Sequence, residues 1–446
     1  MARISVIGLG KLGACMAACF AVKGHEVIGA DLNPVTVSVI NSGIAPVIES
    51  RLQEMIQSAE SRISATTDVF DAVSRTDATF IIVPTPSLED GGFSLEFVKA
   101  AAAPIARAIK GKVSYHLVVL SSTVLPGATC GELVPLLERL SEKRCGLDFG
   151  VCYGPEFIAL GSVIHDLLNP DFVLIGESDP KAGCQLQDIY RGFFDNNPSI
   201  SRMNIVNAEL TKIALNTFVT TKITFANMLA GLCEALPGAD VDVVTAALGQ
   251  DRRVGTRYLR GGLGYGGPCF PRDNKALSSL AKRLDKPAHI AESTDVMNRV
   301  QVDRVVKMVK GIIPYGSNLA VIGLAYKENT PVVEESQPLQ IALDLAKSGY
   351  RVTAFDPLAN SNADTVAAGT IRIAENIDVC LAGADAVVYA RSDDAYAERV
   401  LASHSEGRHP VIIDCWRVLK DHAMNIEDGK YFGVGIASNL INSRRR

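Results

Sequence analysis

The chain has 446 residues, of which 48% are hydrophobic and 21% are charged, the composition of an ordinary globular protein. Because single hydrophobic cores stop growing near about 250–300 residues, two or three domains are expected. The formal net charge of −5 at pH 7 supplies no broad basic face, which argues against nucleic acid as the main partner.

The sequence carries no pattern typical of export, membrane insertion or metal binding. The first predicted strand, Arg3–Ile7, has no charged leader and apolar segment before it, so no secretory signal is expected. No apolar run approaches the roughly 20 residues that span a bilayer. The ten cysteines are scattered, without a CxxC pair or a Cys/His cluster at metal-ligand spacing. We therefore expect a cytoplasmic protein with reduced thiols, no metal and no membrane partner.

The N-terminal segment has the pattern of a dinucleotide-binding unit. Residues 4–13 read ISVIGLGKLG, an apolar strand that runs into a GxGxxG turn formed by Gly8, Gly10 and Gly13. An Ala-rich helix and a second strand come next, and Asp31 stands about 20 residues on. The three glycines allow the tight turn, the approach of a pyrophosphate and close helix–strand packing. Asp31 is suited to bind the ribose hydroxyls of the adenosine, which predicts NAD rather than NADP.

The alternation of strands and helices continues after this unit. Thr79–Val83 and Leu117–Leu120 are predicted strands, and each runs into a polar loop. Ligands bind at the carboxyl ends of the strands in open parallel sheets. Thr85 and Thr123 are therefore placed to touch a cofactor or substrate. A role as turn or capping residues is equally compatible with the sequence.

Glu156 follows a short predicted strand, Val151–Tyr153, in the segment Gly-Pro-Glu-Phe. A carboxylate on such a loop, among apolar neighbours, can have its pKa raised and serve as a base or an acid. The alternative is a carboxylate at the start of a helix.

Residues 207–236 form one long helical pattern that stops at Pro237-Gly238. Its length of about 45 Å exceeds what one small domain needs, so we expect it to join domains and subunits. Lys212 and Asn216 are four residues apart and share one face of this helix. Solvated surface positions are the alternative for both.

The stretch Gly261–Asn274 reads GGLGYGGPCFPRDN and is the most unusual in the chain. Its glycines let the backbone lie close to a bulky group and permit positive φ. Cys269 follows them, with Arg272 and Asp273 within one helical turn, and a nearby cation lowers the pKa of a thiol. An ordinary buried cysteine in a turn is the alternative.

A second α/β unit is expected after a linker at residues 311–316. Its predicted elements are the strands Asn318–Gly323, Arg351–Asp356, Ala386–Ala390 and Pro410–Asp414 and the helix Leu339–Ser348. The unit lacks an intact GxGxxG motif, so we interpret it as a Rossmann-like unit for another nucleotide. The predicted fold is α/β, with two Rossmann-like domains joined by a long central helix and a helical dimerisation region. The expected domains are 1–200 for NAD, 201–310 for the helices with the cysteine loop, and 311–446 for a nucleotide sugar.

Taken together, these motifs resemble those of the UDP-glucose/GDP-mannose dehydrogenase family along nearly the whole chain. The matching segments, in the order of the family, are the GxGxxG turn with Asp31, Val83–Pro86, Ser122–Gly127, Pro155–Phe157, Asn169–Asp171, Ala208–Lys212 with Asn216, Asp251–Gly255, Gly264–Asp273 and Gly323–Lys327. Nine matches in register are highly specific.

The resemblance implies oxidation of the C6 hydroxymethyl of a nucleotide-diphosphate sugar to a carboxylate, with two NAD⁺ and one water. Cys269 would trap the intermediate aldehyde as a thiohemiacetal, which is oxidised to a thioester and hydrolysed. Lys212 and Asn216 would hold the C6 oxygen, and Asp273 would orient water or relay protons. Glu156 would assist attack on the thioester, and Thr123 would help to place the water or the nicotinamide.

The resemblance also implies the binding residues and a partner. The cofactor-binding residues would be Gly8, Gly10, Lys11, Leu12, Gly13, Asp31, Thr85, Pro86, Thr123 and Arg272. The substrate-binding residues would be Glu156, Phe157, Lys212, Asn216, Arg253, Arg260, Gly264, Tyr265, Gly266, Tyr326 and Lys327. Arg253 would reach the sugar site of a neighbouring subunit, which implies a homodimer or a higher homo-oligomer.

Five positions depart from the pattern of the family. Thr36 replaces a basic residue that is common near the adenosine. Leu160 stands where a second glutamate is frequent, and Pro268 precedes the cysteine in place of serine. Glu334 reverses the charge of an arginine, and Trp416 replaces an arginine that some members use for the substrate. UDP-glucose or a UDP-hexose relative is the substrate we expect. GDP-mannose, a two-electron enzyme that stops at the aldehyde, and a sugar-nucleotide-binding protein without turnover are the alternatives.

Overall fold

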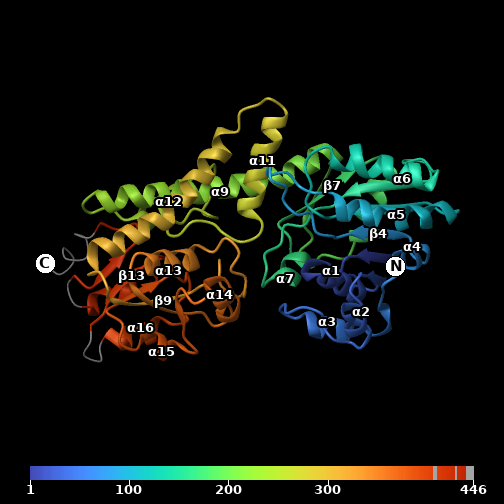
Figure 1. Cartoon of the computed structure of the whole chain (residues 1–446). Coiled ribbons are helices and arrows are strands. Elements are labelled where there is room, and N and C mark those ends of the chain that lie inside the picture. The colour runs from blue at the N-terminus through green and yellow to red at the C-terminus, as the bar shows by residue number, and fades with distance from the viewer. Residues whose placement is uncertain (405–408, 427–428, 438–446) are drawn as a thin grey trace. The chain divides into compact units, whose positions relative to one another are not determined.

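The computed structural model describes residues 1–404, 409–426 and 429–437 (Figure 1). The chain divides into two compact units, Met1–Leu215 and Asn216–Arg446. Each unit contains a mostly parallel sheet with helices on both faces, so the predicted α/β class with two Rossmann-like domains is confirmed. The division into three domains stays a prediction.

The sheet of the first unit has eight strands in the order β3-β2-β1-β4-β5-β6-β7-β8. The strands are β1 (Arg3–Ile7), β2 (Glu26–Ala30), β3 (Ile63–Thr66), β4 (Ala78–Ile81), β5 (His116–Leu120), β6 (Phe149–Tyr153), β7 (Phe172–Glu177) and β8 (Ser199–Asn204). The β6–β7 pair is antiparallel, and the other neighbours are parallel. The strand order reverses between β1 and β4, which places a ligand crevice at the carboxyl ends of these two strands.

Side chains that alternate along the strands build a core on each face of this sheet. The helices of the unit are α1 (Lys11–Val22), α2 (Pro34–Asn41), α3 (Leu52–Ser58), α4 (Val69–Ser74), α5 (Glu96–Gly111), α6 (Val134–Ser141), α7 (Val163–Leu168) and α8 (Pro180–Tyr190). Leu117 and Val119 of β5 pack in the core that α1, α3, α7 and α8 cover. Val118 and Leu120 pack in the opposite core, which α4, α5 and α6 cover. Both faces of the strands are buried, as is typical of parallel sheets.

The long predicted helix is α9 (Ile205–Ala235), a single helix of 31 residues. It begins in the first unit, where Ala208 is fully buried, and continues into the second, where Ala226 and Ala230 are fully buried. Lys212 and Asn216 lie on this helix on either side of the division between the units.

The second unit holds a six-stranded parallel sheet, in the described residues, with the order β11-β10-β9-β12-β13-β14. Its strands are β9 (Asn318–Ile322), β10 (Arg351–Phe355), β11 (Arg372–Ile373), β12 (Ala386–Tyr389), β13 (Val411–Asp414) and β14 (Tyr431–Gly433). Its helices are α10 (Val241–Gly249), α11 (Phe270–Arg283), α12 (His289–Ile312), α13 (Gln337–Lys347), α14 (Asn360–Ala367), α15 (Ile377–Leu381) and α16 (Ala397–Ser403). The order of the strands repeats that of β3-β2-β1-β4-β5-β6 in the first unit.

The predicted linker at residues 311–316 is wrong at its start, because α12 continues to Ile312. Val305 and Val309 of this helix are fully buried against the second sheet, and Ile313 is 4% exposed. The apolar stripe thus continues past Gly311, and burial of that stripe outweighs the low helix propensity of one glycine.

Arg417 joins three segments of the second unit. Its side chain is fully buried and forms a bidentate pair with Asp242 of α10, with both N–O distances at 2.8 Å. It also donates to the carbonyl of Gly261 at 2.6 Å and to that of Val434. The guanidinium therefore connects α10, the glycine-rich loop at residues 261–269 and the segment after β14.

We expect Arg417→Met to lower the free energy of unfolding of the chain by about 3 kcal/mol, because the carboxylate and two carbonyls lose their partner. Urea unfolding followed by circular dichroism measures this loss. Arg399→Met is the matched control, since Arg399 pairs with Asp378 on the surface, where ion pairs contribute about 0–1 kcal/mol. Equal effects of the two substitutions would contradict the structural role of Arg417.

Candidate functional site

In the GxGxxG turn after β1, two of the three glycines, Gly8 and Gly13, have no room for a side chain. A Cβ on Gly13 would lie 1.8 Å from the carbonyl oxygen of Gly8, and one on Gly8 would lie 2.3 Å from that of Ile82. Gly8 also has a φ of 94°, which L side chains rarely adopt. No atom lies within 4 Å of a Cβ built on Gly10. The backbone is therefore open at Gly10, the position where a pyrophosphate approaches the start of α1.

Asp31 lies at the end of β2 beside this turn. Its Oδ2 accepts a hydrogen bond from the backbone N–H of Leu9 at 2.7 Å, and its Oδ1 accepts one from Asn33 at 2.9 Å. Each carboxylate oxygen has a second lone pair. Asp31 is thus fixed in orientation and can still accept the ribose hydroxyls of a dinucleotide, so the residues present fit NAD.

The loops after β4 and β5 are tied to each other. The hydroxyl of Thr85 donates to the carbonyl of Thr123 at 2.7 Å, and that of Ser122 donates to the carbonyl of Val83 at 2.7 Å. Thr85 is 4% exposed, whereas Thr123 is half-buried. Thr85 therefore holds the loop of Thr123 in place, and Thr123 is the more accessible of the two.

Glu209 of α9 anchors the segment that follows Thr123. Its fully buried carboxylate accepts the backbone N–H groups of Gly127 at 2.6 Å and of Thr129 at 2.8 Å. Burial raises the pKa of Glu209, and these hydrogen bonds oppose the rise. One side chain of α9 thus fixes the segment that comes after Thr123.

Glu156 and Lys212 are neighbours in the first unit. The Lys212 ammonium donates to the backbone carbonyl of Glu156 at 2.6 Å and lies 4.5 Å from the centroid of the Phe157 ring. Burial raises the pKa of the Glu156 carboxyl to about 7, and the positive charge of Lys212 acts in the opposite direction. A carboxyl with this pKa can exchange a proton near neutral pH.

The glycine-rich loop of the second unit packs closely against large side chains. A Cβ on Gly262 would lie 2.4 Å from the Trp416 ring, and one on Gly267 would lie 2.5 Å from the Tyr326 ring. Among the loop glycines only Gly267 has a positive φ, of 80°. The need for close packing against neighbouring side chains therefore accounts for more of these glycines than the need for a positive φ does.

Cys269 ends this loop and caps α11 at its N-terminus. The thiol is exposed, in contrast to the alternative of an ordinary buried cysteine. A helix N-terminus favours negative charge, which a thiolate carries. Burial raises the pKa of the nearby Tyr326 hydroxyl, and the charge of Cys269 adds to this effect.

Asp273 lies one turn into α11 and is 1% exposed. Its Oδ2 accepts a hydrogen bond from the side-chain amide of Asn216 at 2.6 Å, and its backbone N–H donates to the carbonyl of Cys269 at 2.8 Å. Arg272 lies 3.5 Å from its Oδ1. The structure thus brings together Asn216, Asp273 and the backbone of Cys269, all in the second unit.

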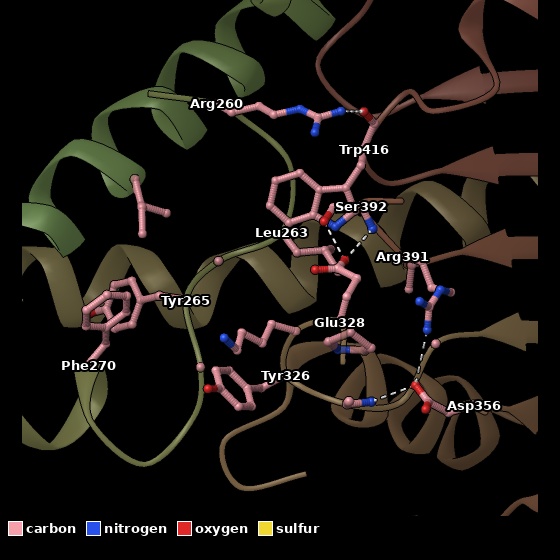
Figure 2. A pocket seen from close by; sticks show the side chains of 18 of the residues that line it. Arg260, Leu263, Tyr265, Phe270, Tyr326, Glu328, Asp356, Arg391, Ser392 and Trp416 are labelled. Atoms are coloured by element: carbon pink, nitrogen blue, oxygen red, sulfur yellow. Dashed lines mark hydrogen bonds and ion pairs between the residues drawn. The ribbon is translucent and has the colours of Figure 1, made fainter. Parts of the chain in front are cut away.

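A cavity of about 290 Å³ lies in the second unit at the carboxyl ends of its strands (Figure 2). Its lining includes Gly323 after β9, Asp356 after β10, Arg391 and Ser392 after β12, and Trp416 after β13. The strand order reverses between β9 and β12, so the cavity occupies the switch point where ligands bind in such sheets. The predicted substrate residues Arg260, Gly264, Tyr265, Gly266, Tyr326 and Lys327 also line it.

Sequence reasoning missed several residues of this cavity, namely Tyr258, Phe270, Glu328, Asp356, Arg391 and Ser392. A signal was present for three of them, because Asp356, Arg391 and Ser392 end or directly follow predicted strands. For Glu328 and the two aromatic residues the sequence offers no comparable signal.

The remaining predicted site residues are Lys11, Leu12, Pro86 and Arg253. Lys11 and Pro86 are exposed, and Leu12 is half-buried against the core of the first unit. Arg253 is exposed and pairs with Asp251 at 2.6 Å. Within the described residues, no group of His, Cys, Asp and Glu has an arrangement that could hold a metal ion.

Comparison with known proteins identifies the family. Three family profiles match in succession: the NAD binding domain of the UDP-glucose/GDP-mannose dehydrogenase family at residues 2–194, its central domain at 206–300 and its UDP binding domain at 320–421. The chain belongs to the UDP-glucose/GDP-mannose dehydrogenase family. It is accordingly an oxidoreductase of the nucleotide-sugar dehydrogenase type with an NAD-binding domain.

Similar proteins in this family act on different sugars. The chain is 34% identical to UDP-glucose 6-dehydrogenase AglM of Haloferax volcanii, over 89% of this chain and 92% of that protein. It is also 34% identical to GDP-mannose 6-dehydrogenase of Pseudomonas syringae pv. syringae, over 79% and 80%. Among solved structures, a UDP-glucose dehydrogenase from Pyrobaculum islandicum aligns with a TM-score of 0.86 at 35% identity, with 98% of each chain covered. In the part of the chain that the structure describes, no helix is long and apolar enough to cross a membrane.

The raised pKa of Glu156 predicts a pH-dependent effect of Glu156→Gln on stability. The pKa is about 7 in the folded chain against an ordinary value of 4.5, so the folded state binds this proton more tightly than the unfolded state. Stability from this group is therefore present below pH 4.5 and lost as the pH rises through 7. We expect the free energy of unfolding of the variant, relative to the native chain, to increase by about 3 kcal/mol from pH 4.5 to pH 8. Urea unfolding across this range measures the difference, and a difference independent of pH would contradict the shift.

Proposed function

We propose that this protein catalyses the four-electron oxidation of the C6 hydroxymethyl of a nucleotide-diphosphate hexose to the uronic acid, with Cys269 as the nucleophile. The observation that carries the proposal is the exposed thiol of Cys269 at the start of α11. It stands at the end of a glycine-rich loop that lines the cavity at the second switch point. A thiol in this position is accessible to a substrate and favoured as a thiolate.

The proposed reaction removes two hydrides from one carbon. The primary alcohol loses a hydride and a proton to give an aldehyde, and the Cys269 thiolate adds to the aldehyde carbon to form the anion of a thiohemiacetal. Loss of a second hydride gives a thioester, and water releases the carboxylate and the thiol. NAD⁺, held at Gly10 and Asp31, would supply the hydride acceptor for each oxidation, so two NADH would form for each product.

Five further polar residues have separate proposed roles. Lys212 and Asn216 stabilise negative charge on the C6 oxygen through N–H donors. Asp273 orients the Asn216 amide, which it contacts at 2.6 Å, and takes part in proton transfer. Glu156, with a pKa of about 7, accepts a proton from the water that attacks the thioester, and Thr123 helps to place that water.

The proposed substrate is UDP-glucose or a UDP-hexose relative. Its support is the match to a UDP binding domain at residues 320–421 and the similarity to UDP-glucose dehydrogenases over 89–98% of the chain. GDP-mannose is the second candidate, because GDP-mannose 6-dehydrogenases are similar at the same level of identity. The ten cysteines, which form no disulfide, favour a reducing compartment such as the cytoplasm for this activity.

We further propose a homodimer formed through the second half of α9. Four large apolar side chains of this helix are 40–65% exposed, namely Phe218, Phe225, Met228 and Leu232, and Leu236, directly after the helix, is 57% exposed. Val243 of α10 is exposed as well. An apolar surface of this size is typical of protein–protein contact. In such a dimer, we propose that Arg253 acts in the sugar site of the partner.

The proposed chemistry predicts that Cys269→Ser halts the reaction after the first oxidation. The native chain should form two NADH per sugar consumed, with one of the UDP- or GDP-sugars in a panel. The variant should lose at least about 100-fold in uronate formation, because a hydroxyl is a far weaker nucleophile than a thiolate at neutral pH. Absorbance of NADH and mass spectrometry of the sugar measure both quantities.

Cys130→Ser is the matched control, since Cys130 is also exposed but lies in the first unit, beyond the loop of Thr123. Native turnover in Cys269→Ser would instead indicate a two-electron enzyme. Binding of sugar nucleotides without any NADH would indicate a protein that has lost turnover.

The proposed dimer predicts that Phe225→Glu combined with Leu232→Glu gives a monomer. Two carboxylates at the centre of an apolar interface cost several kcal/mol when they are buried. Light scattering after size-exclusion chromatography should show half the native mass. Val366→Glu is the control, because Val366 is 56% exposed on α14. A native mass in the double variant would contradict this interface.

A further inference from the structure

Two side chains of the cavity have no role in the chemistry proposed above, Trp416 and Glu328. Figure 2 shows the carboxylate of Glu328 directed toward Trp416 and Ser392, with Leu263 beside it. Trp416 is the single tryptophan of the chain. Both residues line the cavity at the switch point of the second sheet.

The Trp416 indole is held as a platform. Gly262 lies directly against the ring, at a distance that leaves no space for a Cβ. Arg260 donates to the Trp416 carbonyl at 2.7 Å, and its guanidinium lies 5.6 Å from the ring centroid. A flat aromatic ring fixed in a ligand cavity is suited to stack on a nucleobase, and such stacking tolerates every base because each has a π-face.

Glu328 offers one open acceptor to the cavity. Its Oε1 accepts hydrogen bonds from both the backbone N–H and the hydroxyl of Ser392, the former at 2.8 Å. Its Oε2 accepts no hydrogen bond from the described residues. A carboxylate only accepts hydrogen bonds and repels phosphate. The part of a ligand beside Oε2 therefore has hydroxyl or N–H donors and no phosphate.

Comparison of the two sheets explains why Glu328 is the acid in this position. In the first unit Asp31, after the second strand of the motif, receives two backbone N–H groups and keeps lone pairs for a ribose. Its counterpart Asp356 receives four backbone N–H groups, from Leu324, Ala325, Leu358 and Ala359. Asp356 is also 3.9 Å from Arg391 and is 2% exposed. Its acceptor capacity is thus filled, and Glu328 is the carboxylate of the cavity lining that keeps an open oxygen.

We propose that Trp416 and Glu328 bind the nucleoside half of the substrate, with the indole stacked on the base and Oε2 of Glu328 accepting a ribose hydroxyl. Recognition of this half is then independent of the base, and the site takes uridine and guanosine diphosphates alike. The inference rests on the proposed function only in that the ligand is a nucleoside diphosphate.

The single tryptophan makes binding directly measurable on the full chain. UDP and GDP should each quench the Trp416 fluorescence, with dissociation constants within about 3-fold of each other, because stacking is tolerant of the base. Either 2′-deoxy-UDP or 3′-deoxy-UDP should bind about 10-fold more weakly than UDP, because a hydrogen bond to a charged group is lost.

Glu328→Gln isolates the proposed hydrogen bond. Its carbonyl oxygen can still accept from Ser392, while an NH₂ group replaces Oε2 and accepts nothing. In this variant UDP and the deoxy analogue should bind equally, whereas Glu375→Gln, at an exposed position outside the cavity, should keep the 10-fold difference. Calorimetry should give about 10-fold weaker binding of both UDP and GDP to Trp416→Ala, and binding within about 3-fold of native to Trp416→Phe.

Three results would overturn the proposal. They are fluorescence unchanged by either nucleotide, deoxy analogues that bind native chain as tightly as UDP, and a difference between UDP and GDP above about 100-fold, which would mean that the base edge is read. Formation of NADH from nucleotide sugars is measured separately. Turnover combined with any of these results leaves the proposed function intact, and base-tolerant binding without turnover leaves this inference intact.

Discussion

The close packing of the glycine-rich loop is the constraint on which the proposed site depends. Between Gly261 and Gly267 the backbone lies against the rings of Trp416 and Tyr326, where the space of a Cβ is already occupied. Asn227 of α9 receives the N–H of Gly262 at 2.7 Å and donates to the carbonyl of Leu263 at 3.0 Å. The loop is thus held by the two rings and by Asn227, and it ends at Cys269, at the start of α11. A side chain at one of these glycines would force the loop to shift, and this shift would move the thiol of Cys269 and change the shape of the cavity.

The two sheets have a similar glycine turn after the first strand of their motif. Gly8 and Gly323 each directly follow the first strand of their motif, with φ of 94° and 101°. Each donates its N–H to the end of the neighbouring strand, to Ala30 at 2.8 Å and to Phe355 at 2.9 Å. The second sheet differs beyond this glycine, because the segment after Gly323 contains no further glycine of a GxGxxG turn. Side chains such as Tyr326 and Glu328 stand there instead, which fits a ligand other than a dinucleotide.

Much of this architecture could be predicted from local sequence pattern. The apolar strands, the GxGxxG turn and the long helix are specified within windows of 5–31 residues, and periodicity detects them. Strands such as β3 and β11 were missed because they are short and only partly buried. The pairing of Asn216 with Asp273 spans 57 residues, and only tertiary structure creates it. The filled acceptors of Asp356 are likewise invisible in sequence, where it is indistinguishable from Asp31 at the end of a strand.

Glu209 has a mechanical consequence for the first unit. Its carboxylate receives two N–H groups of the loop that carries Thr123, and Lys212 stands one turn later on α9. Rotation of α9 about its own axis would break both charge-assisted hydrogen bonds in a buried environment. The ammonium on the helix and the threonine on the loop are therefore obliged to move as one rigid assembly, so a displacement imposed anywhere along this part of α9 reaches both groups at once.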